Sequence, residues 1–294
     1  MTCSTQAPFN SSQLAKIEMS NYQRHLTSPK EFVASFWQNR QLIMQMTKRE
    51  ILGRYKGSIM GLAWSFFNPV LMLAVYTFFF SVVFKSRWGT EADNSKASFA
   101  VILFVGMLIH SFFSEVINRA PTLILSNINY VKKVVFPLET LPFITVGSAL
   151  FHSAIGLFVL LLIQLAISQN LPWTAVFFPA ILLPLILGSL GFAWFLAAFG
   201  VYARDIGQVT GVFTSVLMFL SPVFYPVSTL QPAYQIYLKL NPLTFIIEEA
   251  RNSLIYGIPP SSTGWCIAMA AGGLTAWLGF WFFQKTRKGF ADVL

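Results

Sequence analysis

Residues 140–203 read TLPFITVGSALFHSAIGLFVLLLIQLAISQNLPWTAVFFPAILLPLILGSLGFAWFLAAFGVYA and contain no Asp, Glu, Lys or Arg. A helix needs about 20 apolar residues to cross the hydrocarbon core of a bilayer, so this stretch is long enough for two crossings, separated near Leu171-Pro172. Four further stretches lack these charged residues: 57–84, 97–114, 206–238 and 252–284. Each holds one crossing, and the sequence therefore predicts six membrane spans.

The composition is that of an integral membrane protein. Hydrophobic residues make up 55% of the 294 residues and charged residues 11%, whereas soluble domains carry roughly 25% charged residues. We predict an all-α integral membrane protein in which a polar tail, residues 1–27, precedes a single transmembrane domain, residues 28–294. The expected spans are 62–84, 98–118, 143–168, 175–201, 208–224 and 265–283. The first twenty residues contain no apolar core segment, so we expect no cleavable signal peptide.

The distribution of basic residues predicts the orientation. Six spans place both termini on one side, which carries fifteen of the 20 Lys and Arg residues, and the opposite side carries Lys85, Arg87, Lys96, Lys239 and Arg251. Because positively charged loops favour the cytoplasm, both termini of this multi-pass protein are predicted on the cytoplasmic side of the membrane. The net charge of +9 follows from this topology and indicates no nucleic-acid partner.

A start signal for a helix stands at Ser28-Pro29-Lys30-Glu31, a capping box with proline at the first helical position. Six apolar residues follow at helical spacing on one face: Phe32, Val33, Phe36, Trp37, Ile43 and Met44. We predict an amphipathic helix along the inner membrane surface, because Trp and Lys or Arg suit the interface. A surface helix packed on the bundle is the alternative.

Few polar groups interrupt the predicted spans. Asn68-Pro69 interrupts the helix ladder of the first span and predicts either a kink or a pore-side feature. Glu115 and Arg119 stand four residues apart near a membrane boundary, where such residues form a local ion pair. His110 and His152 lie in consecutive spans, and we expect hydrogen-bonded packing roles for them; an approach to each other or to the pore is the alternative.

The segment between the fifth and sixth spans is neither a span nor an ordinary loop. Asn241-Pro242 provides an N-cap with proline in the first turn, and Gly257 marks the end of a helix. This helix carries Glu248, Glu249 and Arg251 among apolar residues, so it is too short and too polar to cross. We predict short outer helices here that lie in the outer interface or dip back into the membrane.

The sequence lacks the residues of an ATPase, a metal site or an ion-coupled transporter. It contains no Walker A pattern, and its three histidines and two cysteines are not spaced as a metal-ligand set. No Asp, Glu, Lys or Arg lies at the centre of a span. The carboxylates of a membrane-embedded transferase would have to be Glu248 and Glu249, which point about 100° apart on one helix. We predict no enzyme, no metal and no cofactor in this chain, and a partner that supplies the energy.

Several motifs stand in a fixed order along the chain. They are TKREILGRYKGS at 47–58 with GLAWS at 61–65 and Asn68-Pro69, YVKKVVFP at 130–137, RDI at 204–206, and SPVFYP at 221–226 with Asn241-Pro242 beyond it. Together they resemble permease subunits of type-2 ABC exporters for polysaccharides, most closely exporters of lipid-linked O-antigen, with teichoic-acid and capsule exporters as relatives. The resemblance runs from about residue 30 to the end of the sequence, and only the longer N-terminal tail departs from it.

The resemblance implies an assembly of two copies of the chain, each of which docks one cytoplasmic ATP-binding subunit that holds ATP and Mg²⁺. Residues 126–133 would be the coupling helix that sits in a groove of the ATPase. The residues implied in coupling are Ile128, Asn129, Tyr130, Lys132, Lys133, Arg204 and Asp205. A basic loop that only fixes the topology is the alternative.

The implied substrate is a glycan linked to undecaprenyl pyrophosphate. The glycan needs a polar lumen, and its carrier needs a lateral opening to the membrane lipids. Because aromatic rings pack on the apolar faces of sugars, we expect a channel lining from Trp64, Asn68, Tyr76, Phe213 and Phe219. Arg49, Arg54 and Lys56 either meet the pyrophosphate or anchor the topology. The expected outer gate comprises Tyr225, Glu248, Glu249 and Arg251, and the alternative is that this helix only anchors the fifth span to the sixth.

Overall fold

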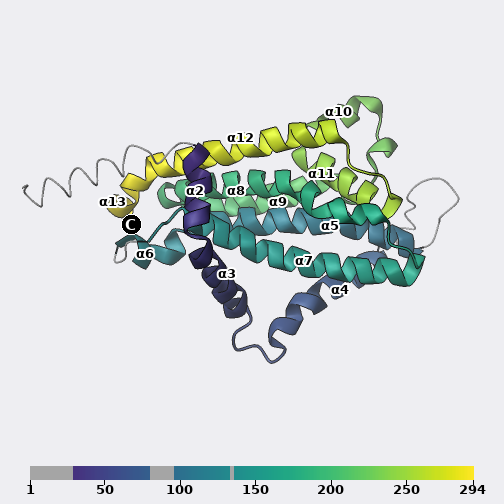
Figure 1. Cartoon of the computed structure of the whole chain (residues 1–294), viewed down its shortest axis with the longest axis horizontal. Coiled ribbons are helices and arrows are strands. Elements are labelled where there is room, and N and C mark those ends of the chain that lie inside the picture. Colours follow the sequence, from purple (N-terminus) through teal and green to yellow (C-terminus); the bar gives the residue numbers. More distant parts are fainter. Residues whose placement is uncertain (1–28, 80–95, 133–135) are drawn as a thin grey trace, which may run out of the picture.

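The computed structural model describes residues 29–79, 96–132 and 136–294. The predicted polar tail, the expected end of the first span after residue 79 and the coupling residue Lys133 lie outside the described residues. Every regular element in the described ranges is helical, as the sequence predicts. Figure 1 shows long helices side by side, with α6 and the C terminus at one end of the bundle.

The helices follow the chain in a simple order. They are α2 (Pro29–Gln38), α3 (Arg40–Arg54), α4 (Trp64–Thr77), α5 (Lys96–Arg119), α6 (Ile128–Lys132), α7 (Thr140–Ser168), α8 (Phe178–Tyr202), α9 (Ile206–Leu220), α10 (Pro232–Leu240), α11 (Pro242–Arg251), α12 (Ser262–Thr286) and α13 (Phe290–Val293). Short 3₁₀ turns are η1 (Gly61–Ala63), η3 (Ala120–Thr122), η4 (Leu125–Asn127), η5 (Trp173–Phe177), η6 (Val227–Thr229) and η8 (Arg287–Gly289), and η7 (Asn252–Tyr256) is a π-helical segment after α11.

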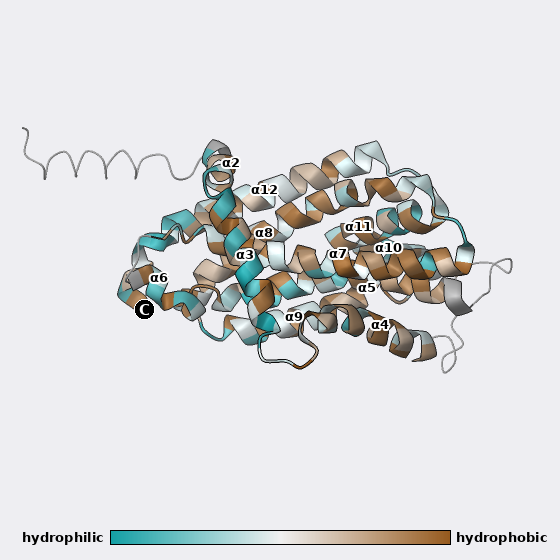
Figure 2. Cartoon of the chain, turned by 60° about the horizontal axis from the view of Figure 1, so that its bottom comes forward, coloured by the Kyte–Doolittle hydropathy of each residue, from teal (hydrophilic) through white to brown (hydrophobic). Residues whose placement is uncertain are grey.

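In the described ranges, four helical stretches are long and apolar enough to cross a membrane: Phe99–Thr122, Thr140–Ser168, Trp173–Tyr202 and Ser262–Val293. They correspond to the predicted spans two, three, four and six. In the described residues, spans one and five correspond to shorter apolar helices, Gly61–Thr77 and Ile206–Leu220. The count of six spans therefore stays a prediction. Figure 2 shows that the long helices are mainly hydrophobic, while hydrophilic residues gather in α3 and at the end that holds α6.

The fifth predicted span ends earlier than the sequence suggests. α9 ends at Leu220, and the next residue, Ser221, has an extended backbone with φ −107° and ψ 151°. The residue before a proline avoids the helical region, because the proline ring clashes with it. Pro222 therefore explains why the helix does not continue to the predicted end at residue 224.

Glycines allow α8 and α12 to form the most extensive helix contact in the described part of the chain. A Cβ atom on Gly279 would collide with the backbone of Gly191, and one on Gly191 would collide with the backbone of Thr275. Helices in a membrane associate largely through close van der Waals packing, which small residues permit. These glycines therefore hold predicted spans four and six together.

The predicted amphipathic segment forms two helices, α2 and α3, which meet at Asn39. Phe32 of α2 belongs to an aromatic cluster, with ring centroids 6.0 Å from Phe143, 5.4 Å from Trp194 and 6.0 Å from Phe280. This packing agrees with the alternative of a helix that lies on the bundle, as far as α2 is concerned. The location of α3 in the membrane surface stays a prediction.

Helices α10 and α11 follow the fifth predicted span. Asn241 caps α11 by accepting a 3.0 Å hydrogen bond from the Leu243 amide, and Gly257 ends η7 with a φ of 69°. Both boundaries match the sequence prediction. α11 packs against α5 and α8, with Ile246 and Ile247 buried. This packing agrees with a segment that dips back along the bundle more than with one that lies flat on it.

Candidate functional site

A cavity of about 630 Å³ lies between α4, α5 and α7. Trp64, Asn68 and Tyr76, three residues that the sequence assigns to a channel lining, face it from α4. Arg54, which the sequence assigns to pyrophosphate binding, lines the same cavity. The structure therefore brings together residues from two separately predicted sets.

The chemistry of this cavity is mixed. Hydroxyl groups come from Tyr55, Ser58, Ser65, Ser111 and Ser153, and apolar walls from Phe104, Met107, Leu108 and Phe112. Pro69 also lines the cavity, and α4 continues on both sides of this proline. The position of Asn68-Pro69 on the cavity wall favours the pore-side alternative for this pair. Hydrogen-bonding groups beside aromatic rings suit a ligand that has both polar and apolar faces.

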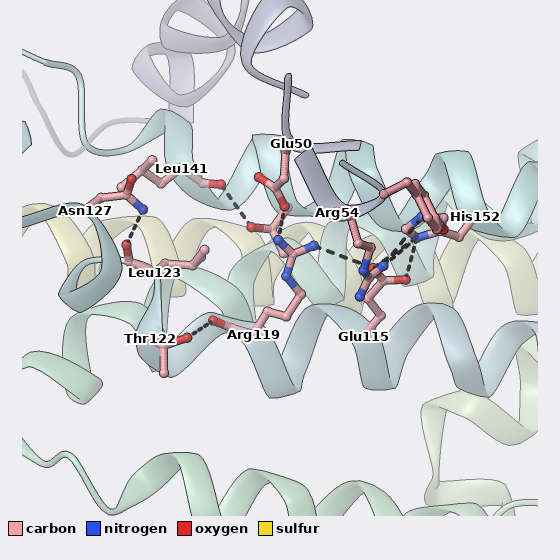
Figure 3. A network of polar contacts seen from close by, with 11 residues as sticks. Glu50, Arg54, Glu115, Arg119, Thr122, Leu123, Asn127, Leu141 and His152 are labelled. Carbon is pink, nitrogen blue, oxygen red and sulfur yellow. Dashed lines mark hydrogen bonds and ion pairs between the residues drawn. The ribbon is translucent and has the colours of Figure 1, made fainter. Parts of the chain in front are cut away.

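Glu115 of α5 is the centre of an ion network on the wall of this cavity (Figure 3). Nη1 of Arg54 lies 2.6 Å from Oε1 of Glu115, and Nδ1 of His152 lies 3.0 Å from each carboxylate oxygen. The Tyr55 hydroxyl is 3.2 Å from Nε2 of His152. Side chains from the end of α3, from α5 and from α7 therefore meet at one carboxylate.

A second ion pair extends the network. Arg119 pairs with Glu50 of α3, and its Nη1 also lies 3.6 Å from Oε1 of Glu115. The contact between Glu115 and Arg119 confirms the predicted local pair. The sequence does not predict that Glu50 and Arg54 are partners of Arg119 and Glu115. One signal is present, because Glu50 and Arg54 are four residues apart, as are Glu115 and Arg119. Where two helices with this spacing cross, the glutamate of each helix can pair with the arginine of the other.

The two histidines in the spans have different partners. Nε2 of His110 lies 3.0 Å from the Thr214 carbonyl oxygen, which joins α5 to α9. His152 belongs to the Glu115 network instead. The contact of His110 agrees with the predicted hydrogen-bonded packing role, whereas His152 also lines the cavity between α4, α5 and α7.

The predicted coupling segment lies at the end of the bundle that also holds the turn between α8 and α9 (Figure 1). The ring of Tyr130 stacks on Phe136 with centroids 4.4 Å apart, and Ile128 and Asn129 are exposed. Arg204 and Asp205 are exposed in the turn. Five residues before the predicted coupling segment, the Pro121 carbonyl of η3 packs directly against Gly200, near the end of α8. Lys132 is the last residue of α6, and the side chains of Lys132 and Lys133 are not described.

Arg287, in the segment after α12, contacts the base of the predicted coupling segment. The sequence does not predict this role. Nη1 of Arg287 lies 2.7 Å from Oε2 of the buried Glu139, just before α7. Nη2 of the same arginine donates a 3.4 Å hydrogen bond to the carbonyl of Phe136, the residue on which Tyr130 stacks. The indole nitrogen of Trp194 donates to the Glu139 carbonyl, at 3.1 Å. Buried and partly buried contacts therefore fix the base of the coupling segment to α8 and η8.

Arg251, assigned by sequence to an outer gate, points into the bundle and is 4% exposed. Its Nε donates to the Ile102 carbonyl at 3.1 Å, and its Nη2 donates to the Val223 carbonyl at 2.9 Å. Gly106 leaves room for the guanidinium, because a Cβ there would lie 2.9 Å from Nη2. Burial lowers the pKa of Arg251 to about 10, so it stays charged at neutral pH. We therefore interpret Arg251 as a residue that positions α11 against α5.

The other expected gate residues have different surroundings. Burial raises the pKa of Glu248 above its usual value, although the charges of Arg251 and Lys239 act in the opposite direction. Oε2 of Glu249 accepts a 3.0 Å hydrogen bond from the Ser261 amide, directly before α12. This contact supports the alternative that the segment anchors predicted span five to span six. The Tyr225 hydroxyl donates to the Phe219 carbonyl at 2.9 Å, so it ties the turn to α9.

Of the residues predicted for the channel lining and for pyrophosphate binding, four lie outside the cavity between α4, α5 and α7. Phe213 and Phe219 are exposed on α9, and Arg49 and Lys56 are exposed near the end of α3. No group of three or more His, Cys, Asp or Glu side chains in the described ranges is placed to hold a metal ion.

The comparison with protein families decides what kind of membrane protein this is. Residues 41–255 match the ABC-2 type transporter family. The chain belongs to this family. This ABC-2 permease is thus a bacterial membrane protein of a transporter family and not of an enzyme family, and transporters of this family work with ATP-binding subunits.

Three relatives of this ABC-2 permease have assigned roles. The O-antigen export system permease protein RfbA of Myxococcus xanthus is 28% identical over 264 residues, which cover 89% of this chain and 98% of the relative. The protein of the same name from Klebsiella pneumoniae is 22% identical over 255 residues, 86% of this chain and 95% of the relative. The polysialic acid transport protein KpsM of Escherichia coli is 24% identical over 221 residues, 71% of this chain and 79% of the relative.

Proposed function

We propose that this permease forms the channel of an ATP-driven exporter that moves an O-antigen polysaccharide, linked to undecaprenyl pyrophosphate, across the cytoplasmic membrane. The cavity between α4, α5 and α7 carries the proposal, because it combines Arg54 with Trp64, Asn68 and Tyr76. A guanidinium suits a phosphate, and aromatic rings suit sugars. The names of two relatives, both O-antigen export permeases, support the same substrate class.

A capsular or teichoic-acid polysaccharide is the second candidate for the substrate. The similarity to KpsM, whose name assigns it to polysialic acid, favours the capsular form. All these candidates share a long polar polymer, so they make the same demands on the cavity. A membrane-embedded transferase has no support from the family.

The proposed assembly contains two copies of the permease and two cytoplasmic ATP-binding subunits, which hold the ATP and Mg²⁺. One apolar face of α9 supports the pairing of two copies. Its exposed residues recur every three or four positions: Val209, Val212, Phe213, Val216 and Phe219. A twofold pair would bury this face and enclose one channel between two copies. In the absence of a partner, these side chains would face lipid.

The proposed orientation places both termini in the cytoplasm, as the positive-inside bias of the sequence requires. It puts the α6 end of the bundle, with Arg204 and Asp205, on the side of the ATPase. Cysteine labelling at positions 90–95 tests this arrangement, since these positions should react with impermeant reagents added from outside. Labelling only from the cytoplasmic side would contradict it.

Reconstitution tests the proposed function directly. The purified permease should hydrolyse no ATP, because the sequence contains no phosphate-binding loop. Adding the ATP-binding subunit should give ATPase activity, a complex of two plus two subunits by native mass spectrometry, and export of lipid-linked glycan into vesicles. Hydrolysis by the permease alone, another subunit ratio, or an active complex that moves no glycan would each contradict the proposal.

Replacement of Tyr130, Lys132 and Lys133 by alanine is expected to impair coupling. Loss of one interface hot spot weakens binding by about tenfold or more, so docking of the ATPase should weaken by at least that factor while membrane insertion is kept. The matched control replaces Lys285 and Lys288, two basic residues on the same side. Equal docking and export in both variants would reduce residues 126–133 to a topological loop.

Reversing the charge of Glu248 or Glu249 tests whether the segment between predicted spans five and six is a gate or an anchor. Glu248→Lys places a third cation beside Arg251 and Lys239, so a gate at this position should show altered glycan export or a leak of small solutes. Glu249→Lys also removes the bond to the Ser261 amide, which should lower the free energy of unfolding by about 1 kcal/mol. Wild-type conductance and export in both variants, in assembled protein, would leave only the anchoring role.

A further inference from the structure

A second cavity, of about 600 Å³, lies between α3, η1 and α7. Its walls are mainly apolar, and we call it the apolar groove. Its apolar lining residues are Met44, Ile51, Leu52, Leu62, Leu150 and Phe151. The side chains of Leu52 and Leu62 expose 52% and 44% of their surface, so they are accessible to a ligand.

The groove is a fixed feature of the fold. A Cβ atom on Gly147 of α7 would lie 3.0 Å from Cγ2 of Thr47, so α3 approaches α7 closely at this point. Farther along α3, the pairs of Glu50 with Arg119 and of Arg54 with Glu115 hold the helix to α5. Because α3 is held on both sides, the space beside it is not the product of a loosely attached helix.

The groove and the first cavity lie next to each other on the same elements. Phe151 lines the groove and His152 lines the first cavity, with ring centroids 5.8 Å apart. Leu52 of the groove precedes Arg54 of the cavity by two residues on α3. A ligand at this place would meet an apolar compartment beside a polar one.

We propose that the apolar groove binds the isoprenoid chain of a polyprenyl pyrophosphate whose head group lies against Arg54 in the first cavity. The inference rests on the proposed function, from which it takes the carrier lipid. A polyprenyl pyrophosphate has one strongly polar end and one apolar end, and the two compartments match these ends in character. An isoprenoid chain in the apolar groove is surrounded by protein atoms and makes many van der Waals contacts with them. This packing favours the groove even though bilayer lipid offers the chain another apolar environment.

An ordinary phospholipid also has an anionic head group and apolar chains. The choice between a phospholipid and the polyprenyl pyrophosphate therefore depends on the head group. Arg54 and His152 both point to the Glu115 carboxylate (Figure 3), and an incoming head must compete with it. A pyrophosphate carries more negative charge and more acceptor oxygens than a phosphodiester, and charge-assisted bonds to a guanidinium are strong. Tyr55 and Ser58 add hydroxyl donors on the same wall. The site therefore favours the carrier lipid over a phospholipid.

The test compares the full-length permease with a Leu52→Trp variant, in which the indole fills the groove. Titration with undecaprenyl pyrophosphate, followed by native mass spectrometry, should show an affinity about tenfold lower, because the indole takes the place of the isoprenoid chain and the van der Waals contacts of the chain are lost. Binding of inorganic pyrophosphate should not change in this variant. Arg54→Gln should weaken binding of both probes. The matched control is Leu162→Trp, at an exposed position of α7 outside both cavities.

Two outcomes would overturn the inference. One is equal affinity of Leu52→Trp and Leu162→Trp for undecaprenyl pyrophosphate. The other is an equal loss of phosphatidylglycerol binding in Leu52→Trp, which would assign the groove to bulk lipid. Leu150→Phe, which fills the groove from α7, replaces Leu52→Trp if that variant does not fold. These are binding measurements, so their failure leaves the export test standing, and a failure of export with normal lipid binding would count against the proposed function alone.

Discussion

Replacing Gly279 by leucine is expected to separate α8 from α12 and to lower the free energy of unfolding by about 3 kcal/mol or more. The new side chain would collide with the backbone of Gly191, which cannot move aside as a flexible side chain can. Because α8 and α12 share the most extensive helix contact in the described ranges, much of the bundle depends on this approach. Thermal unfolding in detergent, followed by size-exclusion chromatography, measures the loss.

Gly273 provides the control on the same helix. A Cβ atom there would meet nothing within 4 Å, so Gly273→Leu should keep the wild-type midpoint of unfolding. Similar midpoints for Gly273→Leu and Gly279→Leu would show that the close contact between α8 and α12 is absent in the membrane protein. A restored midpoint in Gly279→Ala is not expected either, because even the first carbon of a side chain collides there.

Replacing Glu115 by alanine should release α3 from the bundle. Arg54 and Arg119 would lose the carboxylate between them, and His152 would lose its partner on α5. Removal of one member of a buried ion pair costs about 3 to 5 kcal/mol, and the partial exposure of Arg54 reduces this to about 2 kcal/mol here. Limited trypsin digestion should then cleave at Arg54 faster than in the wild type.

The control removes a carboxylate outside the network. Asp292→Ala changes an exposed acid of α13 and should leave both stability and digestion unchanged. A double-mutant cycle of Glu115→Ala with Arg54→Ala should give a coupling energy of about 1 kcal/mol or more, since contacting charged residues are not additive. Additive effects would mean that the two side chains do not interact.

Local rules predicted much of the fold. The charge-free runs located spans two, three, four and six, because the hydrocarbon core sets the same length requirement everywhere along a chain. The boundaries at Asn241 and Gly257 were also predicted, since capping depends on neighbouring residues alone. The early end of α9 depends on a local rule as well, and Pro222 was the available signal.

Contacts between distant segments could not be predicted in the same way. Gly188 and Gly191 look equivalent in the sequence, yet only Gly191 lies against another backbone. Arg54 was predicted as a free cation for pyrophosphate or topology, because its partner Glu115 stands on another helix. The charge of Arg251 suggested an exposed position, and only the packing of α11 shows that backbone carbonyls surround it. In each case the decisive neighbour comes from tertiary structure.

The aromatic cluster around Phe32 sets an order of events during biosynthesis. Phe32 lies near the beginning of the chain, but Phe280, which it contacts, lies near the end. At about 5 to 20 residues per second, roughly ten to fifty seconds pass between the synthesis of these two residues. Helix α2, the first helix of the described ranges, therefore completes its docking site only after α12 has been synthesised. Until then Phe143 and Trp194 can cover only part of the Phe32 ring, and a chaperone or the lipid surface would have to shield the rest.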